Sequence, residues 1–137
     1  MLTENEVIAI VICHLEKSGY KKISTSNTVQ QGHDIVATKG NSHIYIEAKG
    51  ETSSKANTNR FGKGFDSSQT KDHVAKAIYK AIETKSDHPQ GIVGIALPDN
   101  QRQRDLVNRV LPSLKDLGIV VFFANEDGKV DVLNEHG

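Results

Sequence analysis

A β-hairpin predicted for residues 34–49 constrains the fold of this chain more than any other feature of the sequence. Apolar and β-branched residues fill two predicted strands, 34–38 and 43–49, and Gly40 lies in the tight turn between them. A polar strand predicted for residues 21–28 precedes the hairpin, and we expect it at the edge of the sheet. The first part of the sheet is therefore expected to be an antiparallel meander.

Three helices are predicted around these strands. The first covers residues 4–17, with Thr3 as its N-cap and Gly19 just past its end. The other two cover residues 67–85 and 101–117, and a buried strand follows each of them, at 91–98 and 119–124, with a short strand at 129–133. The order α-β-β-β-α-β-α-β predicts an α/β fold with a mixed central sheet flanked by helices.

The length of 137 residues predicts one domain, spanning residues 1–137. The longest apolar run, residues 7–13, is too short to cross a membrane, and the acidic start of the chain is unlike a secretory signal. Cys13 is the single cysteine, so no intrachain disulfide can form. These features together predict a cytoplasmic protein without a membrane partner.

Two carboxylates and a lysine come together at one end of the predicted hairpin. Side chains alternate along a strand, so Glu47 and Lys49 share a face, and Asp34 begins the neighbouring strand. Two carboxylates can hold a hard divalent cation such as Mg²⁺, which prefers oxygen ligands. An adjacent lysine can orient a water molecule or neutralise charge on a phosphate. This pattern predicts a site that hydrolyses a phosphodiester bond.

At these residues the chain resembles the PD-(D/E)xK nuclease superfamily, which has the restriction-endonuclease-like fold. Asp34 matches the first acid, residues 47–49 match the Glu-x-Lys element, and the element order matches over about residues 4–124. The chain looks most like compact members, the Holliday junction resolvases and Mrr-like restriction domains. His33 stands where the motif name has proline. The resemblance implies an αβββαβ core and a metal-dependent DNA endonuclease of restriction or junction-resolving type.

The resemblance also implies roles for single residues. Asp34, Glu47 and the carbonyl group of Ala48 would hold Mg²⁺ or Mn²⁺. Lys49 would position the attacking water and stabilise the transition state.

A third acid is implied on the first helix, where two candidates stand. Glu4 lies on the same face as the apolar stripe of that helix, from which a carboxylate can reach the edge of the sheet. Glu6 has another role available, because Thr3 and Glu6 have the spacing of a capping box. We therefore assign Glu4 to the site, with Glu6 as the alternative.

Residues 69–73 are similar to the Gln-x-x-x-Tyr element of RecB-type nucleases, with His73 in place of the tyrosine. Gln69 and His73 lie one helical turn apart and share a face. Gln69 would hydrogen-bond a metal-bound water or a phosphate, and His73 would contact the nucleic-acid backbone. The alternative is a polar start of a helix with an exposed histidine.

The chain has 17 basic and 17 acidic residues, but the charge is segregated. Residues 49–80 contain seven basic and three acidic residues, and residues 50–65 form a long loop rich in small and polar residues. We expect this region to contact the phosphates of DNA. The expected contacts are Lys55, Arg60, Lys63, Lys71, His73 and the lysine next to Ala75, which is Lys76.

The chain shows no recognition helix or zinc module, so we expect structure-selective or weakly specific cleavage. Cutting both strands needs two sites, which predicts a homodimer formed through the third helix or the 119–123 strand. One alternative is a nucleic-acid-binding module whose site is silent. Another is a metal-binding or protein-interaction domain, which the zero net charge favours.

Overall fold

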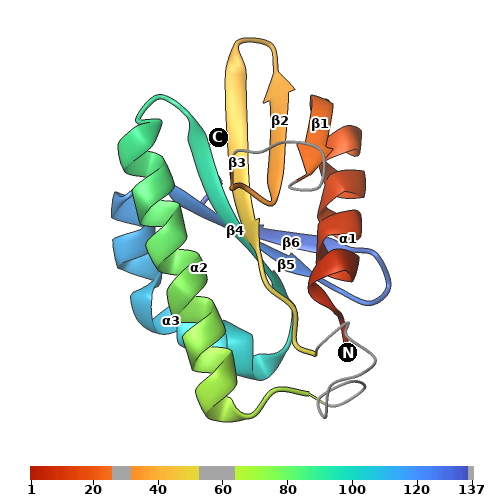
Figure 1. The fold of residues 1–137 in the computed structure, drawn as a ribbon, viewed down its shortest axis with the longest axis vertical. Coiled ribbons are helices and arrows are strands. Elements are labelled where there is room, and N and C mark those ends of the chain that lie inside the picture. The colour runs from red at the N-terminus through yellow and green to blue at the C-terminus, as the bar shows by residue number, and fades with distance from the viewer. Residues whose placement is uncertain (26–31, 53–63, 136–137) are drawn as a thin grey trace.

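The computed structural model describes residues 1–25, 32–52 and 64–135 (Figure 1). Within these residues, three helices and six strands follow one another as α1 (Glu4–Lys17), β1 (Lys21–Thr25), β2 (Ile35–Lys39), β3 (Ser42–Ala48), α2 (Ser67–Asp87), β4 (Ile92–Pro98), α3 (Gln101–Asp116), β5 (Ile119–Ala124) and β6 (Val130–Leu133). The predicted order of elements is confirmed, including the short last strand.

The six strands form one mixed sheet in which they lie in chain order, β1 to β6. β3, β4 and β5 are parallel to one another, and the remaining neighbours pair antiparallel. The two parallel connections carry α2 and α3. Both connections step across the sheet in the same direction, which places both helices on one face, and α1 lies on the other face (Figure 1). The predicted α/β class with a mixed sheet and helices on both faces is confirmed.

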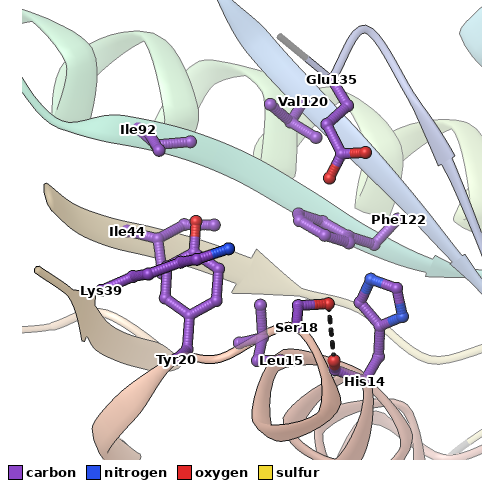
Figure 2. Close-up of a pocket in the computed structure, with 10 residues that line it drawn as sticks. All are labelled: His14, Leu15, Ser18, Tyr20, Lys39, Ile44, Ile92, Val120, Phe122 and Glu135. Atoms are coloured by element: carbon purple, nitrogen blue, oxygen red, sulfur yellow. Dashed lines mark hydrogen bonds between the residues drawn. The ribbon is translucent and has the colours of Figure 1, made fainter. Parts of the chain in front are cut away.

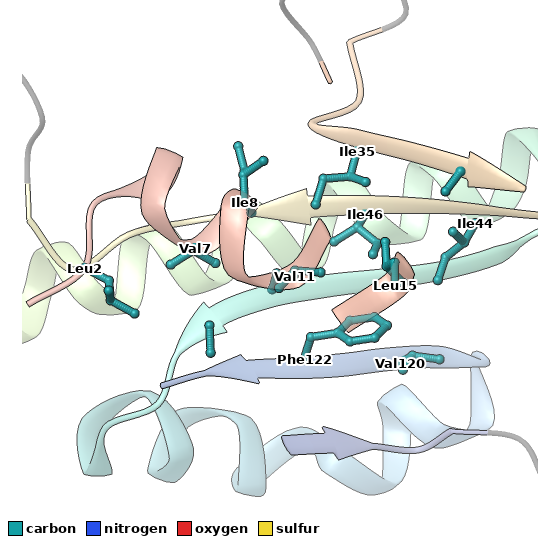
Figure 3. Packing of buried hydrophobic residues seen from close by; sticks show 14 residues of the cluster. Leu2, Val7, Ile8, Val11, Leu15, Ile35, Ile44, Ile46, Val120 and Phe122 are labelled. Atoms are coloured by element: carbon teal, nitrogen blue, oxygen red, sulfur yellow. The ribbon is translucent and has the colours of Figure 1, made fainter. Parts of the chain in front are cut away.

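Each face of the sheet has its own hydrophobic core. The apolar stripe of α1 packs on strands β2 to β5, as Figure 3 shows for Val7, Ile8, Val11 and Leu15. On the other face α2 and α3 cover a second cluster, which contains Val93, Ile95, Leu97, Val121 and Phe123. The central strands β4 and β5 are therefore apolar on both sides, as expected for parallel strands between two helical layers.

Local signals in the sequence fix the ends of α1 and the turn of the hairpin. Thr3 and Glu6 form a reciprocal capping box, and Gly19 follows the helix with a φ of 95°. In the hairpin, Lys39 pairs with Ser42, so the turn has two residues, of which Gly40 has a φ of 61°. Glycine suits both positions because a positive φ is strained for residues with a side chain.

The structure bears on three further predictions about the strands. The polar strand expected at residues 21–28 is seen as β1 at the sheet edge, and residues 26–28 lie outside the described part. The hairpin strands begin and end within one residue of the expected bounds, and Asp34 lies just before β2. The 119–123 segment is wrong as a dimer surface, because β5 lies between β4 and β6 and is buried throughout.

None of the helices in the described part of the chain is long and apolar enough to cross a membrane.

Candidate active site

The candidate site lies at the end of β3, on the face of the sheet that α2 covers. Ile46 and Ala48 are buried in the core beneath α1, whereas Glu47 and Lys49 alternate with them and are half-buried. The predicted sharing of one face by Glu47 and Lys49 is therefore confirmed. The backbone N–H of Lys49 donates a 3.0 Å hydrogen bond to the carbonyl of Ala96, which keeps the strand end fixed to β4.

Asp34 is joined to this strand end by a hydrogen bond. Its Oδ2 accepts a hydrogen bond from the backbone N–H of Ala48, with a distance of 2.8 Å. Ile35 pairs with Ile46 in the antiparallel ladder, and the same register continued by one residue sets Asp34 opposite Glu47. Directly opposed residues of two strands have Cβ atoms about 5 Å apart. The two predicted acids are thus neighbours across β2 and β3.

The surroundings of Glu47 favour its neutral form. Removal of water by burial raises the pKa of its carboxyl group, and the charges of Asp34 and Glu4 raise it further. Lys49 and Lys80 oppose this shift, and the resulting pKa is about 7. Two or three carboxylates held this closely repel one another, and a cation between them relieves the repulsion.

Glu4, the first residue of α1, interacts electrostatically with the same charged residues, although it is far from them in the sequence. Loss of water around the Glu4 carboxyl group raises its pKa, the charge of Asp34 adds to the effect, and Lys49 opposes it. Glu6 instead accepts a 2.9 Å hydrogen bond from the backbone N–H of Thr3. Glu4 therefore interacts electrostatically with Asp34 and Lys49, whereas Glu6 completes the predicted capping box.

Gly50 explains how the start of α1 approaches the end of β3. A Cβ atom on Gly50 would overlap the backbone nitrogen of Glu4 and would lie 2.7 Å from the carbonyl carbon of Thr3. Glu51 reinforces the contact, since its Oε2 accepts a 3.0 Å hydrogen bond from the backbone N–H of Leu2. The absence of a side chain at Gly50 is what allows Glu4 to lie near Lys49.

His73, on α2, lies near Lys49. The His73 ring stacks on Phe65, with centroids 4.6 Å apart and an angle of 8° between the planes. Burial lowers the pKa of His73, and the positive charges of Lys49 and Lys76 lower it further. His73 is therefore close enough to Lys49 for their charges to interact, and its ring is stacked on Phe65.

Lys80 is a functional candidate that the sequence analysis did not find. It lies two helical turns after His73 on α2, and its Nζ is 3.6 Å from the position that a Cβ atom on Gly32 would take. Its charge lowers the pKa of Glu47, as the charge of Lys49 does, so it belongs to the same electrostatic group. The i, i+7 spacing from His73 is the one signal in the sequence that could have indicated it.

The other predicted contacts lie apart from the acids or cannot be placed. The Gln69 side chain accepts a 3.0 Å hydrogen bond from the backbone N–H of Asp66 and so completes the cap of α2. Lys71 lines a groove between α2 and α3, together with Ala75 and Val110. Lys55, Arg60 and Lys63 lie outside the described residues.

The donor set at the strand ends suits a hard divalent cation. Asp34, Glu47 and the carbonyl of Ala48 all offer oxygen, which Mg²⁺ and Mn²⁺ accept. Among the residues that the structure describes, no group of three or more His, Cys, Asp and Glu side chains is arranged to hold a metal ion. Mg²⁺ does not require such a cage, because it commonly binds one or two carboxylates and completes its shell with water and phosphate.

A small cavity of about 160 Å³ lies on the other face of the sheet, near the end of α1 (Figure 2). Its lining includes the apolar side chain of Phe122 and the charged side chains of Lys39 and Glu135. Lys39 lies across the Tyr20 ring, with 5.6 Å between Nζ and the ring centroid. None of the predicted site residues lines this cavity, so it is separate from the candidate site.

Comparison of the chain with protein-family models, with curated proteins and with solved structures gave no significant match.

Proposed function

We propose that this chain is a Mg²⁺-dependent nuclease that hydrolyses phosphodiester bonds in DNA, as an endonuclease of the PD-(D/E)xK kind. The observation that carries the proposal is the meeting of Asp34 and Glu47 at adjoining strand ends, with Lys49 on the same face. The pKa of Glu47, raised to about 7, supports it, since strongly shifted carboxyl groups are typical of functional sites.

Lys49, Lys80 and Glu4 would each have a separate role in the reaction. Lys49 would hold the attacking water in line with the phosphorus and would stabilise the charge that develops on the phosphate. Lys80 would attract the phosphate from the α2 side. Glu4 would accept a hydrogen bond from a water molecule at the same site. Each role needs a side chain near the acids, and the electrostatic contacts of all three residues support this.

Asp34, Glu47 and the Ala48 carbonyl would hold the metal ion. When bound, Mg²⁺ supplies positive charge that lowers the pKa of its waters and neutralises the phosphate. Mn²⁺ offers the same coordination and would replace it. The carboxylates themselves would be ionised in this state, with the repulsion between them removed.

A homodimer remains part of the proposal, with α3 as its surface. Val110 and Leu117 on this helix are 37% and 43% exposed, which leaves apolar area for a second subunit. Two copies would present two sites, one for each strand of a duplex. Sedimentation velocity tests this, because a monomer at all concentrations would contradict it.

The function is tested with purified protein on supercoiled plasmid, linear duplex and a four-way junction, each with Mg²⁺, Mn²⁺ or EDTA. We expect metal-dependent cutting that Lys49→Ala abolishes. The matched control is Lys17→Ala, which removes an exposed lysine at the end of α1 and should cut normally. Equal cutting by Lys49→Ala would refute the catalytic assignment. DNA binding without any cutting would instead support a silent binding module.

A further inference from the structure

Three aromatic rings contact one another beside the proposed active site. The rings of Tyr45 and His88 are stacked, with centroids 4.2 Å apart and an angle of 18° between the planes. The ring of His33 lies 5.2 Å from Tyr45 and 5.9 Å from His88. We call His33, Tyr45 and His88 the ring cluster. Its members come from the segment before β2, from β3 and from the C-cap of α2.

The ring cluster lies on the same side of the sheet as the acids. Tyr45 precedes Glu47 by two residues on β3, so both side chains project from one face, about 7 Å apart along the strand. His33 directly precedes Asp34. Adjacent phosphates along one DNA strand are separated by a rise of about 3.4 Å. The distance from acids to rings therefore matches a step of one or two nucleotides.

The cluster is held in place and remains accessible. Tyr45 packs against Gly91, where a Cβ atom would lie 2.9 Å from Cε2 of the tyrosine ring. His33, Tyr45 and His88 are each half-buried, so part of every residue is open to solvent. A fixed, partly exposed aromatic surface loses little side-chain entropy when another ring stacks on it.

A positive charge completes the surroundings of the cluster. The Nζ of Lys80 lies close to Gly32, next to His33 in the chain. Burial lowers the pKa of His33, and the charges of Lys80 and His88 lower it further. Proteins that bind single-stranded nucleic acid combine rings, on which the bases stack, with cations that meet the phosphates.

We propose that the ring cluster is a stacking site for an unpaired nucleobase, one or two nucleotides from the phosphate that the acids would engage. This inference rests on the proposed function and narrows its substrate. Bases within a duplex are stacked on one another and cannot reach the rings, so a substrate with an unpaired segment would be favoured over a continuous duplex. Stacking on a ring face accepts any base, so the site selects structure rather than sequence.

The test uses a single-stranded oligonucleotide with one 2-aminopurine, and a duplex of the same sequence, both in EDTA so that no cutting occurs. We expect the fluorescence of 2-aminopurine to be quenched when the wild-type protein binds the single strand, and far less with the duplex. His88→Leu should bind the single strand about 5- to 100-fold more weakly, as loss of one stacked base implies, and should lose the quenching. His88→Phe keeps a ring and should retain both.

Several outcomes would overturn the proposal. They are wild-type binding without quenching, equal quenching with the duplex, and unchanged affinity in His88→Leu. If thermal unfolding shows that His88→Leu is not folded, His33→Leu takes its place in the same comparison with His33→Phe. Cutting assays on the wild type keep the two hypotheses apart. Quenching without metal-dependent cutting would support the stacking site and refute the nuclease function. Cutting without quenching would support the nuclease function and refute the stacking site.

Discussion

The Asp34 carboxylate accepts a hydrogen bond from the backbone N–H of Ala48, at 2.8 Å between Oδ2 and the nitrogen. The bond lies one step beyond the last backbone pairs of β2 and β3, and it holds the two strand ends together. The negative charge of the same carboxylate raises the pKa of Glu47. Asp34 therefore combines a structural contact, which an amide could also make, with a charge, which an amide could not supply.

Asp34→Asn separates these two roles. The asparagine Oδ1 can accept the hydrogen bond from Ala48, so we expect thermal stability to change by less than about 1 kcal/mol. Loss of the charge should lower the pKa of Glu47 and abolish metal-dependent cutting. Carboxyl ¹³C chemical shifts followed against pH measure the pKa directly. An unchanged Glu47 pKa in this variant would contradict the placement of the two acids.

Glu47→Gln should make the protein more stable at pH 8 and leave it almost unchanged at pH 4. At pH 4 Glu47 is largely protonated in both the folded protein and the unfolded chain, so glutamine resembles it in both states. Above the ordinary pKa of 4.5 the unfolded chain ionises first, because the pKa in the folded protein is about 7, and the wild type loses stability until the pH passes that value. Glutamine resembles the neutral form, so the gain at pH 8 should be about 1–2 kcal/mol after allowance for solvent screening.

Urea unfolding at the two pH values measures this difference. Glu83→Gln is the matched control, since Glu83 is an exposed glutamate of α2 and its removal should give no such pH-dependent gain. A Glu47→Gln variant that is less stable than the wild type at pH 8 would refute the proposed electrostatic repulsion.

The periodicity of the sequence was sufficient to predict the elements and the face of the sheet that bears the acids. The bounds of α1 followed from Thr3, Glu6 and Gly19, because capping is local and needs no tertiary information. The shared face of Glu47 and Lys49 followed from strand alternation in the same way. Signals that extend over a few residues are therefore reliable in this chain.

Contacts between distant segments could not be read from the sequence. Lys80 and His88 reach the site from the far end of α2, and only the packing of that helix on β3 brings them there. The sequence also assigned Gln69 to the site because it fits a family motif, but its side chain completes the local cap of α2. The interior position of β5 depended on the pairing of β6, which the order of elements left open.

Gly50→Ala should displace the start of α1 and destabilise the protein by about 1–3 kcal/mol, because the new Cβ atom would meet backbone atoms of Thr3 and Glu4. We also expect reduced cutting, since Glu4 would move away from the site. Gly64→Ala is the matched control, since its Cβ atom would meet the flexible end of Met1, 2.9 Å away, which can move aside. Equal melting temperatures for the two variants would contradict the close approach at Gly50.

Binding of Mg²⁺ should release protons, and the number released should depend on pH. At pH 6.5 Glu47 is largely protonated because its pKa is about 7, and the carboxyl group must lose this proton before its oxygen can bind a cation. At pH 8.5 the group is already ionised, so little further release is expected, and the apparent affinity should rise between these two values. Isothermal titration calorimetry in two buffers of different ionisation enthalpy counts the protons. Binding with no proton release at pH 6.5, or with the same release in Glu47→Gln, would show that Glu47 is not the titrating ligand.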